Sequence, residues 1–156
     1  MRWVTRKGVR FDRTACAWFI KRFLDKDAEF GFLSEEEMPA AIEAGAEAFH
    51  NYAWTGRRED LPQERINFPA LIAKYGYDTK DRALPIMAEN VRKAERSGFA
   101  KDGSEDYSLW AIANGISAMV GGDDAAITER MMPVYDALYA YCQLKAQGNP
   151  GWTTGA

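Results

Sequence analysis

The chain has 156 residues, 47% of them hydrophobic and 28% charged, which suits one domain with its own core and excludes a largely disordered chain. The formal net charge of −3 and the scattered basic residues argue against general affinity for nucleic acid. No apolar run approaches the roughly 20 residues that span a bilayer, so we expect neither a nucleic-acid nor a membrane partner.

The first fifty residues alternate between strand-like and helix-like segments. The expected order is strand, helix, strand, helix and strand, over residues 2–6, 12–25, 29–33, 34–45 and 47–50. Ser34 and Glu37 form a capping box at the start of the second helix, and Gly45 ends it. Because strands and helices alternate, the pattern predicts a small, partly parallel sheet.

The remainder of the chain is predicted to be helical. Helices are expected over residues 68–75, with Asn67 as the cap, over 81–96 and over 104–120, and Asp123 or Asp124 is expected to cap a long last helix. On the third of these helices the apolar positions are expected to face inward: Leu109, Ile112, Ala113, Ile116, Met119 and Val120. The predicted fold is therefore α/β: one helix-rich domain over residues 1–147 with a small, partly parallel sheet from its N-terminal third, and a flexible tail over residues 148–156.

The helix over residues 12–25 is the most informative segment. An apolar stripe is formed at helical spacing by Cys16, Phe19, Ile20, Phe23 and Leu24, whereas Lys21 is expected in solvent. Asp12 occupies the expected N-cap position, and Arg13 lies in the first turn beside amide groups without intrahelical partners. A guanidinium beside free amides can bind a carboxylate, a phosphate or a metal oxyanion. The alternative is a capping Asp12 beside a solvated Arg13.

Other residues could complete such an anion site. The candidates for added charge or an aromatic wall are Trp18, Arg22, Trp54, Arg57 and Arg58. The last three lie in residues 51–66, a stretch without periodicity that is either a functional loop or a surface loop held by Trp54. Cys16 could reduce or ligate a bound oxidant, because a helix N-terminus lowers the pKa of a thiol. The alternative for Cys16 is an inert thiol buried on the apolar stripe.

The two cysteines and the single histidine limit the kinds of metal site and catalysis that the chain could support. Cys16 and Cys142 have no metal-binding spacing, which favours free thiols in the cytoplasm, and the first residues lack a signal-peptide core. His50 is the natural general base if the protein is an enzyme, although no nucleophile elbow or phosphate loop indicates a reaction. The sequence therefore indicates no particular cofactor and leaves catalysis open.

One segment resembles a known family. The order Asp12-Arg13-x-Ala15-Cys16-x-Trp18-x-Ile20-x-Arg22-Phe23-x-Asp25, followed by Ala28-Glu29-Phe30, is similar to the C-terminal-domain family of the chromate resistance protein ChrB. Later segments are similar as well, in consistent order: Phe68-x-Ala70-Leu71-Ile72-x-Lys74-Tyr75-Gly76, residues 84–92, and Tyr135-Asp136-Ala137-Leu138-Tyr139-Ala140-Tyr141-Cys142. The resemblance implies a domain linked to chromate resistance.

The chain departs from the family pattern in one place. The family carries a His-His-Gly run and then a cysteine before the phenylalanine that corresponds to Phe68. Here the region reads Trp54-Thr55-Gly56-Arg57-Arg58, and Ile66 stands at the cysteine position. If those family residues bind a metal, the resemblance implies that this chain has lost the site. A metal at His50 with Glu59 or Asp60 is the alternative.

Three functions follow from these observations. We expect first a cytosolic domain that handles a small anion or oxyanion, as a sensor or as an accessory to detoxification. The first alternative is an enzyme acting on a small organic molecule, with His50 as its general base. The second alternative is a non-catalytic regulatory or interaction domain. The sequence leaves the oligomeric state open.

Overall fold

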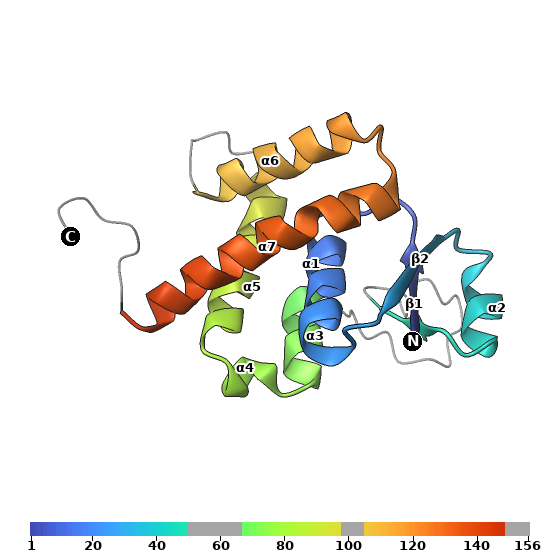
Figure 1. Cartoon of the computed structure of the whole chain (residues 1–156), viewed down its shortest axis with the longest axis horizontal. Coiled ribbons are helices and arrows are strands. Elements are labelled where there is room, and N and C mark those ends of the chain that lie inside the picture. Colours follow the sequence, from blue (N-terminus) through green and yellow to red (C-terminus); the bar gives the residue numbers. More distant parts are fainter. Residues whose placement is uncertain (50–66, 98–104, 149–156) are drawn as a thin grey trace.

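A computed structural model of the chain describes residues 1–49, 67–97 and 105–148 (Figure 1). Its elements are β1 (Arg2–Arg6), α1 (Phe11–Phe19), η1 (Ile20–Leu24), β2 (Glu29–Leu33), α2 (Met38–Glu43), β3 (Glu47–Ala48), α3 (Phe68–Lys74), α4 (Tyr77–Lys80), α5 (Ala83–Ser97), α6 (Glu105–Met119) and α7 (Asp124–Ala146). Helix greatly exceeds strand, and the sheet comes from the N-terminal third, so the predicted α/β class is confirmed. The boundary at residue 147 stays a prediction, and the expected tail lies outside the described residues from position 149 onward.

The three described strands form a parallel sheet in the order β2-β1-β3. Trp3 of β1 is in register with Phe30 on one side and with Glu47 on the other. Parallel neighbours need a crossover, which α1 and η1 supply between β1 and β2, and α2 supplies between β2 and β3. The predicted third strand ends earlier than expected, at Ala48, although the Phe49 amide still donates to the Val4 carbonyl at 3.0 Å.

Helix α1 is the centre of the molecule. Figure 1 shows α7 crossing it, and α3 and α5 also pack against it. Eight of its nine residues are buried, among them the polar Asp12 and Thr14. The expectation of a single apolar stripe on this helix was therefore wrong, because neighbouring helices enclose nearly the whole circumference.

The predicted helix over residues 12–25 changes character halfway. At Ile20 it becomes the π-helix η1, in which the Asp25 amide donates to the Ile20 carbonyl, five residues back, at 2.7 Å. Phe23 is only half-buried in this wider turn. Lys21 is half-buried as well, and its Nζ donates to the Ala28 carbonyl at 3.0 Å. The expected contrast between a buried Phe23 and a solvated Lys21 was therefore wrong.

Several predicted caps are present. The Glu37 carboxylate accepts hydrogen bonds from the amide and the hydroxyl of Ser34, at 2.8 and 3.0 Å, just before α2. The Asn67 side chain accepts from the main chain of α3 at 3.0 Å, and that of Asp123 accepts from the main chain of α7 at 2.7 Å. The bonds to Asn67 and Asp123 each satisfy an amide that has no partner within its own helix, so these two signals located the starts of α3 and α7 correctly. The Ser34–Glu37 pair is formed, but α2 begins only at Met38, four residues later than expected.

Helix α6 lies at the periphery, packed on α5 and α7 (Figure 1). Its partly buried apolar residues that reach the core include Leu109, Trp110, Ala113 and Ile116. Ile112 and Met119 were expected to face inward but are 50% and 74% exposed. The predicted inward face included too many residues. Helical spacing shows which residues share a face, but it does not show how much of that face a neighbouring helix covers. Within the described residues, no helix combines the length and apolar character needed to cross a membrane.

Candidate anion site at the start of α1

The loop between β1 and α1 is held by the first residue of α7. The Asp124 carboxylate accepts hydrogen bonds from the amide of Gly8 at 3.0 Å and from that of Val9 at 2.9 Å. Gly8 has a φ of 82°, a left-handed conformation that favours glycine. This anchor places Arg10 at the N-cap of α1, where its own side chain forms no capping hydrogen bond.

Arg13 fixes the same loop from the other side. Its Nη1 donates to the carbonyls of Arg6, Lys7 and Gly8 at 3.0, 3.0 and 3.2 Å. Burial, followed by the charge of Arg6, lowers the pKa of Arg13, which stays protonated because guanidinium titrates far above neutrality. Part of the guanidinium that was predicted to bind an anion is therefore engaged in the structure of the loop.

Asp12 caps a helix, but not its own. Its side chain is buried, and its two oxygens accept from the amide of Phe68 at 3.0 and 3.2 Å. Phe68 is the first residue of α3, so Asp12 satisfies a free amide of that helix. The prediction that Asp12 is the N-cap of the first helix was wrong, because α1 begins one residue earlier with Arg10 at its N-cap.

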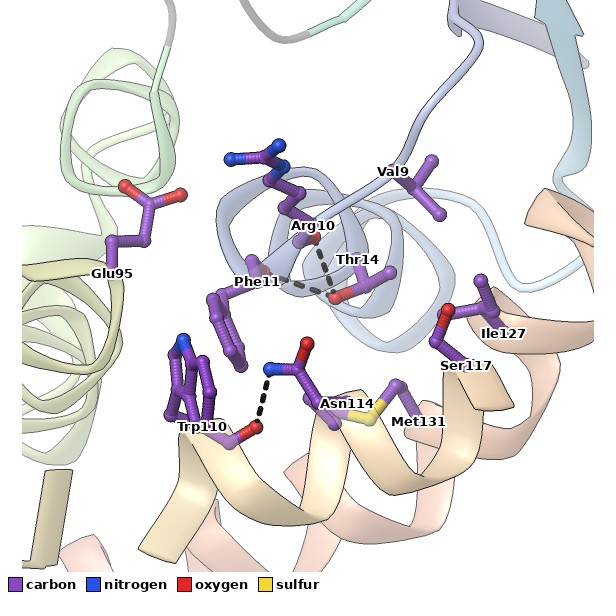
Figure 2. A pocket seen from close by; sticks show the side chains of 11 residues that line it. Val9, Arg10, Phe11, Thr14, Glu95, Trp110, Asn114, Ser117, Ile127 and Met131 are labelled. Carbon is purple, nitrogen blue, oxygen red and sulfur yellow. Dashed lines mark hydrogen bonds between the residues drawn. The ribbon is translucent and has the colours of Figure 1, made fainter. Parts of the chain in front are cut away.

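Two pockets open beside this first turn. The larger, of about 620 Å³, lies between the start of α1 and helices α5, α6 and α7 (Figure 2). It is lined by Val9, Arg10, Phe11, Thr14, Glu95, Trp110, Ala113, Asn114, Ser117, Ile127 and Met131. The smaller, of about 340 Å³, shares Arg10 and Glu95 with it and adds Gly8 and Arg13. Arg10 and Glu95 thus border both spaces.

The polar side chains at the pockets differ in the hydrogen bonds that they form. The Thr14 hydroxyl lies 2.8 Å from that of Tyr135 and also bonds to main-chain carbonyls of the first turn of α1. Burial raises the pKa of Tyr135, so this pair stays neutral. Glu95 Oε1 accepts from the Asp12 amide at 3.3 Å. Arg10 is exposed, and its guanidinium forms no hydrogen bond or ion pair with any residue that the structure describes.

Cys16 lies in the core, one turn beyond Arg13. It is fully buried, and burial, helped by the charges of Asp12 and Glu95, raises the pKa of its thiol well above the ordinary value. The thiolate is the reactive form of cysteine, so this environment opposes the reductive role considered for Cys16. The packing matches the alternative of an inert thiol, and Cys142 is likewise a buried thiol outside any disulfide.

Trp18 and Arg22 meet at a different place, the junction of α1 and η1 with α7. The Trp18 indole donates to Asp136 Oδ1 at 2.8 Å, and Arg22 donates through Nε and Nη2 to both oxygens of that carboxylate at 2.9 Å. The hydrogen bonds from Arg22 lower the pKa of Asp136. The structure thus brings these two predicted ligands together, but not with Arg13.

Sequence reasoning missed Arg10 and Glu95 as members of the site. Arg10 directly precedes the predicted helix and could have been found as a charge at its start. Glu95 is contributed by α5, and no local signal links it to α1. The predicted residues His50, Trp54, Arg57 and Arg58 lie outside the described residues. Among the residues that are described, no group of three or more histidine, cysteine or acidic side chains could hold a metal ion.

Comparison with known proteins gives one family. The family profile described as "ChrB, C-terminal domain" matches residues 3–142. Protein ChrB from Cupriavidus metallidurans is 27% identical over 139 residues, which are 89% of this chain and 40% of that protein. The aspartate–tRNA(Asp/Asn) ligase from Parvibaculum lavamentivorans is 30% identical over 116 residues, which are 70% of this chain and 18% of the ligase. This chain therefore spans less than half the length of either relative. No solved structure matches it.

Proposed function

This chain belongs to the ChrB C-terminal domain family, and from that premise we propose that it is a cytoplasmic small-anion-binding domain of chromate-resistance type. Membership confirms the resemblance seen in the sequence and supports a role in chromate resistance in general terms. The anion-binding role and the compartment are the proposal. Two buried cysteines that form no disulfide are typical of a reducing compartment, which favours the cytoplasm.

The position of Arg10 carries the proposal. Arg10 is the N-cap residue of α1 and lines both pockets, and its guanidinium has no partner among the described residues. The first turn of a helix favours negative charge, and a guanidinium forms strong, paired hydrogen bonds with oxyanions. Arg13 adds a second positive charge that its three carbonyl partners hold in place. An oxyanion in the smaller pocket would therefore meet two arginines.

Glu95 is the opposing charge in this pocket. Its carboxylate already accepts a hydrogen bond from the Asp12 amide, so this end of α1 is suited to a carboxylate oxygen. With Glu95 ionised, the two arginines still leave the pocket lining with a net positive charge. Glu95 would weaken the binding of an anion without preventing it.

Calorimetric titration with chromate, sulfate and phosphate tests the proposal. We expect Arg10→Gln to weaken binding about 10-fold or more, which corresponds to the loss of a charged hydrogen bond. Glu95→Gln should tighten binding, because it removes a repelling charge. Lys26→Gln removes the same charge as Arg10→Gln from an exposed turn after η1 and should leave binding unchanged. The proposal fails if the wild type binds none of the three anions or if Arg10→Gln binds as the wild type does.

The other predicted ligands divide into two groups. Trp54, Arg57 and Arg58 stay predictions from the sequence, because they lie outside the described residues. Trp18 and Arg22 are left out of the proposed site, since both are bonded to Asp136 at the far end of α1. Because the Cys16 thiol is buried and protonated, the proposal is binding of the anion and not its reduction by this residue.

A further inference from the structure

We infer that the ligand of this site is an organic anion with a flat apolar body, with its anionic group at Arg10 and its body in the larger pocket. This inference rests on the proposed anion site and extends it, because it names the class of ligand. It comes from the contrast between the two adjoining pockets. The smaller one has a charged lining, whereas the larger one combines charged and apolar residues.

The larger pocket has the size and lining of a site for an organic molecule. Its volume of about 620 Å³ lies within the range of pockets that enclose small organic ligands. In Figure 2, Arg10 and Glu95 lie on one side of the space, and Trp110 and Met131 lie on the other, with the ring of Phe11 between them. A bare tetrahedral oxyanion would use only the charged side and would leave the apolar wall in contact with water.

The aromatic rings favour a flat body. Phe11 and Trp110 come from α1 and α6, and both present rings to the pocket (Figure 2). Stacked and edge-on contacts between rings add to the free energy gained from burying apolar area. A planar or aromatic group would therefore gain more from this wall than a branched aliphatic group of equal size.

Asn114 provides a second point of recognition. Its Nδ2 donates to the Trp110 carbonyl at 2.7 Å, which fixes the side chain of Asn114. Its oxygen is turned toward the first turn of α1, across the pocket (Figure 2). An amide oxygen accepts hydrogen bonds, so a hydroxyl or amino group on the body of the ligand would find a partner there. The ligand class is thus a small planar acid that carries a hydrogen-bond donor.

Paired probes separate the body of the ligand from its charge. Calorimetry compares phenyl phosphate with inorganic phosphate, and benzoate with acetate, so that each pair differs by one ring. Burying a ring in the larger pocket should tighten binding about 10- to 100-fold within each pair. Ala113→Phe fills the apolar part of the pocket and should abolish that advantage while leaving phosphate binding unchanged. Ala111→Phe makes the same change at an exposed position of α6 and should alter neither measurement.

The outcomes distinguish this inference from the proposed function. If phosphate and phenyl phosphate bind equally, the inference is wrong and the anion site stands. If phenyl phosphate binds more tightly but Ala113→Phe keeps that advantage, the ring lies elsewhere and the inference is wrong. If no probe and no inorganic oxyanion binds, both fail. Should Ala113→Phe not fold, Ser117→Leu fills the same pocket from the next turn of α6 and decides the question.

Discussion

The two ends of the α1–η1 helix use similar residues in opposite ways. At its C-terminal end, Trp18 and Arg22 are both bonded to Asp136, and the surrounding space is filled by aromatic rings. At its N-terminal end, Arg13 is engaged with a loop, but Arg10 borders two open pockets. An arginine on one helix is thus structural or available according to what packs opposite it, and its place in the sequence does not decide which.

The largest effect is expected from a tryptophan at the closed end. Trp18 is 1% exposed and contacts the rings of Phe23, Phe68 and Tyr139, so Trp18→Ala should lower the free energy of unfolding by about 3–5 kcal/mol. Trp110→Ala, at the open end, should cost less than half as much, because Trp110 is only half-buried beside a pocket. Urea denaturation measures both. Equal losses would mean that the two ends are equally well packed.

A smaller effect separates the two arginines of the open end. Arg13→Ala should lower the free energy of unfolding by about 1.5–3 kcal/mol, the usual range for hydrogen bonds to a charged group. Arg10→Gln should stay within about 0.5 kcal/mol, since Arg10 is exposed and has no partner among the described residues. Thermal and urea unfolding of both variants check the contrast. A fully stable Arg13→Ala protein would show that the three carbonyl contacts contribute little.

The smallest effect concerns the ion pair of the closed end and its dependence on pH. Asp136→Asn should lower the free energy of unfolding by about 0.2–1 kcal/mol at pH 7, because both partners are about half exposed. Arg22 lowers the pKa of Asp136, so the pair stabilises the protein above the unfolded value of about 3.9. That contribution is lost as the pH falls through the lower, folded pKa.

Unfolding curves of the wild type and Asp136→Asn at a series of pH values test this dependence. The difference between the two proteins should be largest near neutral pH and should shrink as the solution is acidified below about pH 4. Added salt should reduce it as well, because the pair is exposed. A difference that grows on acidification would mean that Asp136 acts through packing and not through its charge.

The features that were predicted correctly are those that depend on residues close together in the sequence. The caps at Asn67 and Asp123 and the alternation that gives a parallel sheet are local signals, and all were confirmed. Asp12 shows the limit of such signals: its residue type indicated a cap, but only the packing of α3 on α1 shows which helix it serves. Nothing in the spacing of residues 12–25 indicated the π-helix, since a wider turn keeps the same apolar residues near the core.

The candidate site was predictable only in part. The start of the first helix was identified as the place where an anion would bind, and pockets lie there. The members of the site were harder to find, because Glu95 and Asn114 reach it from distant helices. The bonds from Arg13 to the preceding loop depend on the path of that loop, which Asp124 sets from the far end of the sequence. Contacts between residues so far apart in the sequence produce no periodic pattern from which they could be predicted.

The π-helix also makes the length of this segment a constraint on the chain. Deleting Ile20 or Lys21 would restore the spacing of an ordinary helix and would move Arg22 to the preceding position of that helix. Arg22 would then no longer meet Asp136, although 114 positions separate the two in the sequence. In related chains, a one-residue gap in η1 should therefore accompany the loss of the acidic residue at position 136. In an alignment, these two changes should occur in the same sequences although they lie far apart in the chain.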